Sequence, residues 1–219
     1  MNATASPAAV GATPAAPPIH GKIRADLQLV ADLVREGARV LDVGCGEGLL
    51  LHYLARTKNV DARGIEIRQE GVNACVQHGL SVVQGNAETD LPDYPSDAFD
   101  YVILSQTLQA MRDPRGMLRE LLRIGKHAIV SFDNFGYWRF RLELFFGGRM
   151  PVVDAPRHTW YDGDNIRPCT WHDFQLLCRD LAIAPERCFI VQGNGRTREV
   201  PTGSKLANFT GRQAVFLLK

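Results

Sequence analysis

The sequence has no long apolar run and no leader-like N-terminus. No stretch reaches the 18 or so consecutive apolar residues that a membrane-spanning helix needs. The first residues lack the basic region and apolar core of a secretory signal, and they also lack the arginines of a transit peptide. These absences predict a cytoplasmic protein without a membrane partner.

A surplus of charge of either sign is also missing. The 25 Lys and Arg residues are balanced by 24 Asp and Glu residues, which gives a formal net charge of +1. A chain without a basic surplus has little electrostatic attraction for a polyanion, so we expect no nucleic-acid partner.

Cysteine is sparse, and its spacing excludes common cysteine frameworks. The five cysteines are odd in number and widely separated, and no C-x-x-C pair occurs. We therefore expect reduced thiols and no metal site.

The chain length suits one domain with a tail. Residues 1–20 are rich in Ala, Pro and Thr and cannot form an apolar face, so we expect a disordered tail. The remaining residues, 21–219, are enough for a single domain with a sizeable core.

One stretch, RVLDVGCGEG at residues 39–48, has the clearest functional pattern. A short apolar strand runs into Gly44, Gly46 and Gly48, and an apolar helix follows at 49–55. Glycine permits a sharp turn and the close approach of a ligand, so strand, glycine turn and helix together predict a nucleotide site. Glycines that serve packing alone are the alternative.

The spacing of the glycines narrows the class of nucleotide that the turn is expected to bind. A dinucleotide fingerprint would need a glycine at position 49, which is Leu49, and no lysine of a phosphate-binding loop lies between Arg39 and Lys58. Acidic Asp42 and Glu47 beside the turn favour a cationic ligand. S-adenosylmethionine carries a sulfonium and an ammonium group, and the pattern resembles motif I of class I S-adenosylmethionine-dependent methyltransferases. In this turn Cys45 is interpreted as a small residue that fits.

Further strands agree with this interpretation. Glu66 follows Gly44 by 22 residues, close to the spacing at which a strand-end carboxylate accepts hydrogen bonds from ribose hydroxyls. The alternative for Glu66 is a strand-end glutamate that is merely solvated. Ile67, beside it, could pack on the adenine. The methyltransferase resemblance implies that Asn86 and Ala87 contact the base and that Ser105 and Gln106 face the methyl donor or its product, S-adenosylhomocysteine.

The apolar runs alternate with helical patterns along the chain. This alternation predicts a Rossmann-like, doubly wound and mostly parallel α/β sheet of the class I methyltransferase type. We expect seven strands, the last of them antiparallel, at residues 39–43, 59–67, 80–84, 99–104, 126–132, 187–191 and 213–218.

An aromatic-rich insertion occupies about residues 133–169. It is too long for a plain connection, and we expect it to roof the crevice or to form a protein interface. Residues 138–146 have helical spacing, which is equally compatible with burial of Phe140, Leu144 and Phe145. The rim candidates His158, Trp160 and Tyr161 lie among turn formers.

The motifs together resemble the methionine biosynthesis protein MetW family. The resemblance rests on VLDVGCGEG, RGIEI, VVQGNAE, FDYVILSQTLQA, AIVSFDNFGYW and RHTWYDGDNIR, and it covers roughly residues 24–218. It implies a bacterial, cytoplasmic protein that supports homoserine O-acyltransferase, an early enzyme of methionine synthesis. In the first of two hypotheses for the function, the protein is an activating subunit that binds S-adenosylmethionine as an effector.

Catalytic methyl transfer to a small acceptor remains open beside this role. In that case Asp133, His158 or Tyr161 could orient or deprotonate the acceptor. Ser105 and Gln106 are neutral, and neither is an evident general base, which favours the activating role.

Overall fold

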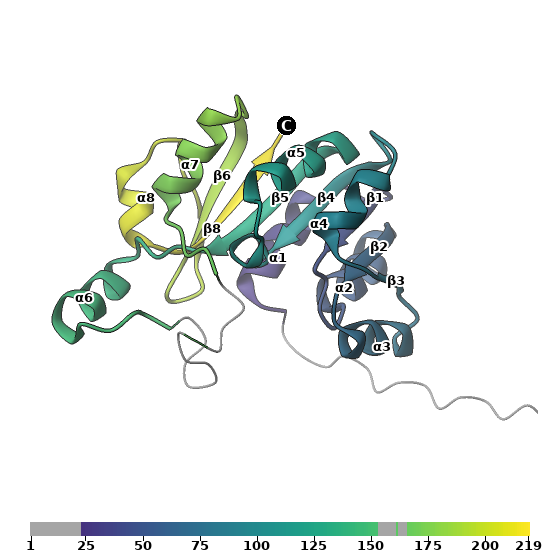
Figure 1. Cartoon of the computed structure of the whole chain (residues 1–219), viewed down its shortest axis with the longest axis horizontal. Helices are drawn as coiled ribbons and strands as arrows, with labels where there is room; N and C mark the ends of the chain where they lie inside the picture. Colours follow the sequence, from purple (N-terminus) through teal and green to yellow (C-terminus); the bar gives the residue numbers. More distant parts are fainter. Residues whose placement is uncertain (1–22, 153–160, 162–165) are drawn as a thin grey trace, which may run out of the picture.

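An eight-stranded sheet, ordered β3-β2-β1-β4-β5-β8-β6-β7, forms the centre of the computed structural model (Figure 1). The structure describes residues 23–152, 161 and 166–219. The predicted disordered tail and the rim candidates His158 and Trp160 lie outside the described residues. The fold is of the predicted doubly wound type, but its sheet has eight strands and not seven.

Six strands run in one direction and two run in the opposite direction. The parallel strands are β1 (Arg39–Val43), β2 (Asp61–Glu66), β3 (Ser81–Gln84), β4 (Phe99–Ser105) and β5 (Gly125–Asp133). Strand β6 (Pro185–Gln192) runs in the same direction as these five, and the reversed strands β7 (Thr197–Glu199) and β8 (Gly211–Leu218) pair with it in antiparallel fashion. Because β8 inserts between β5 and β6, the last strand of the chain is buried inside the sheet.

The additional strand, β7, lies in a polar stretch in which no strand was predicted. Its three residues are all exposed, and it pairs with β6 at the sheet edge. Glu199 of β7 accepts hydrogen bonds from the Arg187 side chain at 2.7 and 2.9 Å. A strand held by backbone pairing and an exposed ion pair carries no hydrophobic alternation that sequence analysis could detect.

Helices cover both faces of the sheet (Figure 1). The helices are α1 (Ala25–Leu33), α2 (Leu49–Lys58), α3 (Gln69–Gln77), α4 (Ala87–Asp90), α5 (Pro114–Ile124), α6 (Trp138–Gly147), α7 (Trp171–Asp180) and α8 (Lys205–Thr210). Short 3-10 turns occur at Leu91–Asp93 and Leu108–Ala110. Helices α1 and α2 contribute to the core on one face, and α5 and α7 contribute to the core on the other.

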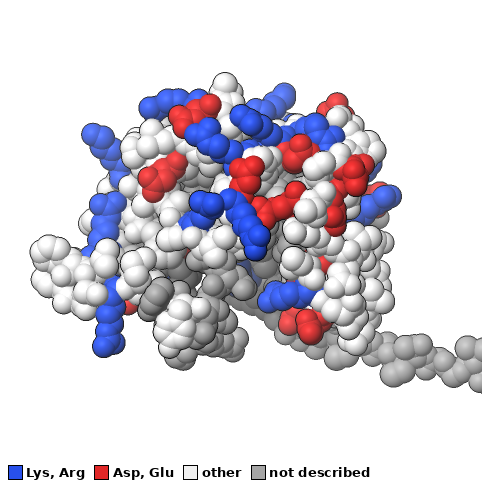
Figure 2. Space-filling view, in the orientation of Figure 1, with Lys and Arg blue, Asp and Glu red and all other residues white. Residues whose placement is uncertain are grey.

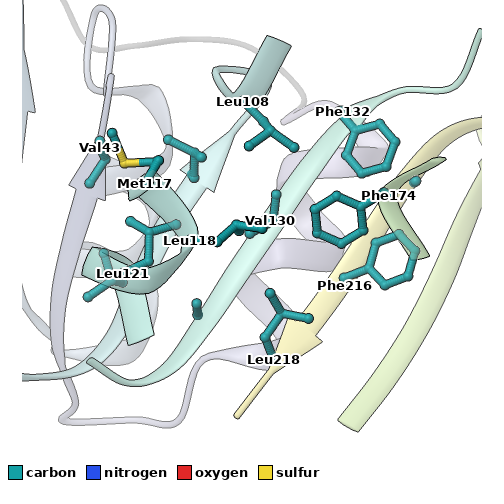
Figure 3. Packing of buried hydrophobic residues seen from close by; sticks show 14 of the residues in the cluster. Val43, Leu108, Met117, Leu118, Leu121, Val130, Phe132, Phe174, Phe216 and Leu218 are labelled. Carbon is teal, nitrogen blue, oxygen red and sulfur yellow. The ribbon is translucent and has the colours of Figure 1, made fainter. Parts of the chain in front are cut away.

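The core beneath α5 and α7 is aromatic at one end and aliphatic at the other (Figure 3). Phe174 of α7 lies with its ring centre 5.0 Å from that of Phe132 and 4.6 Å from that of Phe216. Leu118 and Leu121 of α5 are fully buried. Each such side chain removed from water contributes on the order of 1.5–3 kcal/mol, so this packing fixes the strand ends that carry the site.

Helix α6 forms where the helical spacing predicted it, but none of its residues is buried. Leu144 is 49% exposed and Phe145 is 80% exposed, so their burial, one of the two alternatives, is wrong. Phe140 alone is half-buried, with its ring 5.7 Å from that of Phe135 and 5.6 Å from that of Tyr137. In the described part of the chain, no helix is long and apolar enough to cross a membrane.

Candidate functional site

The site lies where the winding of the sheet reverses. Strand β1 pairs with β2 on one side and with β4 on the other, so the chain leaves β1 in one direction and returns on its opposite flank. At such a switch point the loops after the two strands diverge and leave a crevice at their carboxyl ends. The glycine turn follows β1. On the other side, Ser105 is the last residue of β4, and Gln106 and Thr107 follow it.

The glycine turn has the backbone that its sequence predicted. Gly44, Gly46 and Gly48 have φ angles of 73°, 55° and 79°, which is the left-handed region. Gly48 also forms the N-cap of α2. The Gly44 N–H donates to the Ile65 carbonyl at 2.8 Å, which ties the turn to β2.

The three glycines differ in what surrounds them. A Cβ on Gly44 would lie 2.7 Å from Cγ2 of Thr107, and one on Gly48 would meet Cys75 Sγ at 2.7 Å. A Cβ on Gly46 would meet nothing within 4 Å. The outer two glycines therefore permit packing, whereas Gly46 leaves open space beside the turn for a ligand.

Glu66 is buried, and it already holds the turn. One carboxylate oxygen accepts from the Gly46 N–H at 2.8 Å, and the other accepts from the Arg68 N–H at 2.9 Å. The Arg68 guanidinium is also 3.4 Å from this carboxylate. A carboxylate has about four lone-pair sites, so these bonds leave acceptor capacity for a ligand. The solvated alternative is wrong, since only 4% of Glu66 is exposed.

Asp42 places a second carboxyl group beneath the turn. It is buried, and its Oδ1 atom accepts no hydrogen bond within the described residues. Burial, and secondarily the Glu66 charge, raise the pKa of Asp42 to about 7. An orphaned buried acceptor beside a second carboxylate is costly by itself and is relieved by a cation. The site therefore fits a positively charged ligand.

The end of β4 has an unusual backbone. Gln106 has a φ angle of 57° although it is not glycine. Three hydrogen bonds to Ser131 of β5 hold it there. Its N–H donates to the Ser131 carbonyl at 2.9 Å and to the Ser131 hydroxyl at 3.2 Å, and its Nε2 donates to the same hydroxyl at 3.4 Å. The Ser105 hydroxyl lies 3.1 Å from the same hydroxyl. Local strain of this kind clusters at functional sites, and Ser105 and Gln106 are half-buried at the crevice.

The predicted adenine-side residues are exposed or half-buried. Ile67 is 61% exposed, directly after β2. Asn86 is exposed and caps α4, because its Oδ1 atom accepts from the Glu88 N–H at 3.1 Å. Ala87 is half-buried. Since Glu88 accepts from the backbone N–H groups of Arg112 and Asp113 at 2.8 Å each, the loop after β3 is braced against the loop after β4.

The candidate acid–base residues differ in their exposure to solvent. Asp133 is buried at the end of β5, and its carbonyl accepts from the Gln109 side chain at 3.0 Å. Tyr161 is 69% exposed, and His158 is outside the described residues. Burial raises the pKa of the Cys45 thiol, consistent with its interpretation as a packed residue and not as a thiolate nucleophile. In the described part of the chain no cluster of His, Cys, Asp and Glu could hold a metal ion.

Sequence reasoning missed three supporting residues. Thr107 packs against Gly44, Ser131 holds Gln106, and Gly71 lets α3 approach the turn. A Cβ at Gly71 would lie 2.8 Å from the Gly46 carbonyl oxygen and 2.9 Å from Glu66 Cγ. No local pattern assigns these supporting roles, because each residue acts on a segment distant from it in the sequence.

Comparison with known proteins places the chain among methyltransferase-like sequences. The family model of the methionine biosynthesis protein MetW matches residues 24–218. The bifunctional methionine biosynthesis protein MetXA/MetW of Rhodopirellula baltica is 35% identical over 170 residues. The match covers 74% of this chain and 27% of that protein. The chain therefore spans about a quarter of that relative's length.

Two further similarities concern enzymes. The ubiquinone biosynthesis O-methyltransferase of Xanthomonas oryzae pv. oryzae is 36% identical over 160 residues, covering 69% of this chain and 66% of that enzyme. Among solved structures, an S-adenosylmethionine-dependent methyltransferase from Archaeoglobus fulgidus superposes with a TM-score of 0.64 at 16% identity. That superposition covers 89% of this chain and 91% of the other, and it shows the shared fold.

Proposed function

Since the chain belongs to the family of the methionine biosynthesis protein MetW, we propose that it is an activating subunit of homoserine O-acyltransferase. The observation that carries this proposal is the relative named MetXA/MetW, in which the family's sequence forms part of a longer bifunctional methionine biosynthesis protein. Two functions joined in one chain act at high effective concentration. Separate chains with the same roles would need a binding surface to achieve this.

S-adenosylmethionine is the ligand proposed for the crevice. Glu66 would accept from the ribose hydroxyls, and Ile67, Asn86 and Ala87 would border the adenine. The open space beside Gly46 would receive the methionine part, with Ser105 and Gln106 opposite. The buried Asp42 carboxyl supports a cationic ligand, because a positive charge nearby offsets the cost of its ionisation.

In an activating subunit this ligand would act as an effector. S-adenosylmethionine is made from methionine, so its occupancy would report the end product of the pathway. A ligand regulates only through different affinities for two states. The proposal therefore requires that occupancy change the affinity of this protein for the acyltransferase or the rate of the complex.

Catalytic methyl transfer is the second candidate, and the similarity to the ubiquinone biosynthesis O-methyltransferase favours it. Methyl transfer needs chiefly alignment and exclusion of water, so the lack of an acid–base pair at Ser105 and Gln106 does not oppose it. Asp133, Tyr161 and His158 remain the candidates to orient or deprotonate an acceptor.

The test is homoserine acylation by the cognate acyltransferase, with acetyl-CoA and with succinyl-CoA. The rate is measured without this protein, with it, and with it plus S-adenosylmethionine. A rise of tenfold or more on addition is expected, with a further change when the ligand is present. An unchanged rate with both donors would contradict the activating role, and a screen of small acceptors for methyl transfer would then follow.

A further inference from the structure

Helix α6 exposes large apolar side chains beside helix α8. Phe145 and Phe146 are 80% and 78% exposed. We define the α6–α8 patch by the exposed apolar residues Leu142, Leu144, Phe145, Phe146, Met150, Leu206 and Phe209. Figure 1 shows both helices at the same end of the molecule, away from α3. Clustered exposed aromatics of this kind mark interaction surfaces.

The base of α6 is held firmly, so the patch is presented in a defined position. Arg141 donates to the Gly136 carbonyl at 2.5 Å, and its guanidinium lies 5.9 Å from the Phe209 ring centre. Asn134 anchors the preceding loop: its Nδ2 donates to the Asn208 and Gly211 carbonyls at 2.9 and 2.8 Å. The two helices are therefore joined at their bases, and a preorganised surface loses less entropy on binding.

The border of the patch is basic. Arg139, Arg141 and Arg149 are exposed on and just after α6, and Glu143 is the only acidic residue of the helix. In Figure 2 the protruding region at the lower left is mostly uncharged, with blue side chains along its inner side. Apolar anchors with an arginine border suit a partner whose apolar depression has an acidic rim.

A second copy of this chain is a poor occupant for the same reason. A symmetric dimer places one patch against its own copy. The three arginines of each copy would then face a surface of the same sign, with one glutamate each to offset them. Like charges brought together at an interface oppose association, so the charge pattern favours a different protein.

We propose that the α6–α8 patch is the docking surface for the acyltransferase, whose matching surface is apolar and rimmed by Asp and Glu. This inference rests on the proposed function. The position of α6 also connects docking to the crevice. Ser131 of β5 holds Gln106 in the crevice, and the same strand ends at Asp133, five residues before α6 begins. A shift of this strand end with ligand occupancy would reach the bound partner directly.

The test measures binding of the cognate acyltransferase to the full-length chain by calorimetry or interferometry. The double variant Phe145→Ser/Phe146→Ser is compared with the wild type. Val76→Ser is the matched control, because Val76 is 59% exposed on α3 at the other end of the molecule. Both variants remove exposed side chains, and thermal unfolding and S-adenosylmethionine titration check that each is folded. We expect at least tenfold weaker acyltransferase binding in the double variant and none of this loss in the control.

Charge is tested separately with Arg149→Glu. Its acyltransferase affinity should fall by about threefold or more, and the salt dependence of the remaining affinity should be weaker. Equal affinity of the wild type and the double variant would overturn the docking assignment and leave the proposed function intact. No binding and no stimulation by the wild type would overturn the proposed function and, with it, this assignment.

Two other occupants have their own outcomes. If sedimentation shows a wild-type dimer that the double variant converts to a monomer without loss of acyltransferase binding, the patch is an interface between copies. If vesicles of anionic phospholipid bind the wild type but not the double variant, and acyltransferase binding is unchanged, the patch is a lipid-binding surface. Either result contradicts the proposal.

Discussion

At the residue scale, the two buried carboxyl groups beneath the glycine turn have different environments. Glu66 is satisfied by backbone N–H groups, whereas Asp42 has an oxygen without a donor. Glu66 therefore shapes the crevice. The raised pKa of Asp42 favours its neutral form until a cationic ligand binds beside it. This difference makes their substitutions distinguishable.

Glu66→Gln is expected to weaken S-adenosylmethionine binding by about 1–3 kcal/mol, because the site loses a charged acceptor. In the wild type the two carboxylate oxygens accept from the Gly46 and Arg68 N–H groups. The glutamine amide has only one oxygen, so its NH2 group would face one of these two donors. Calorimetric titration measures the change. Glu70→Gln, an exposed position on α3, is the control. Wild-type affinity in Glu66→Gln would remove the ribose-binding role.

Asp42 predicts a pH dependence of ligand affinity. With its pKa raised to about 7, the free protein holds a proton that a cationic ligand would expel. Affinity should therefore fall as pH drops below about 7, by up to about tenfold per unit, and should level off above it. Titrations between about pH 5 and 8 measure this slope.

The Asp42→Asn variant is the control for that slope. It lacks the titrating group, so its affinity should vary little over the same range. Without ligand, the wild-type free energy of unfolding should decline as pH rises from about 4 to about 7, because the folded state keeps a proton that the unfolded state releases. An equally steep affinity slope in Asp42→Asn would assign the titration to another group.

At the scale of the element, different glycines of the turn serve packing and ligand binding. Gly44→Ala should lower the free energy of unfolding by about 2–4 kcal/mol, from left-handed strain plus collision with Thr107. Gly46→Ala incurs only the strain, about 1–2 kcal/mol, because its Cβ would lie in open space.

For the folded variants, the loss of ligand affinity should be larger in Gly46→Ala than in Gly44→Ala, the opposite of the order for stability. Gly46→Ala places a methyl group in the space assigned to the ligand, so its S-adenosylmethionine affinity should fall by tenfold or more. Chemical denaturation and ligand titration on the two variants provide both measurements. A Gly46→Ala variant that binds normally would show that the ligand does not lie beside this residue.

At the scale of the whole molecule, Asn134 joins three distant segments. Its Nδ2 group donates to two carbonyls near α8 and β8, and its Oδ1 atom accepts from the Gly136 and Trp171 N–H groups at 3.0 and 2.9 Å. The side chain is fully buried. Such a hub links the sheet, α7 and the base of α6.

Asn134→Ala should therefore reduce the free energy of unfolding by about 2–4 kcal/mol, since buried donors and acceptors are left unsatisfied. Urea denaturation measures this loss. Asn73→Ala, at an exposed position of α3, should change it by less than about 0.5 kcal/mol. A stability of Asn134→Ala close to that of the control would show that the four bonds have replacements.

The prediction of the fold from the sequence succeeded wherever local pattern and packing agree. The apolar runs predicted β1 to β5 to within a few residues. The runs are clearest in β1, β4 and β5, because these parallel strands are mostly buried and therefore hydrophobic along most of their length. The same reasoning missed β7, whose residues are polar and exposed. It also left the environment of α6 open, because its apolar residues lie all around the helix and carry no preferred face.

The sequence by itself determined the glycine turn and the carboxylate that follows it, since positive φ and a strand-end acid are local requirements. Only the tertiary structure decided that Thr107, Ser131 and Gly71 support this turn, that the Asp42 carboxyl has an unsatisfied oxygen, and that Phe145 and Phe146 face solvent. These properties depend on which segments meet in space. Burial and hydrogen-bond satisfaction are relations between distant residues, and no local pattern in the chain records them.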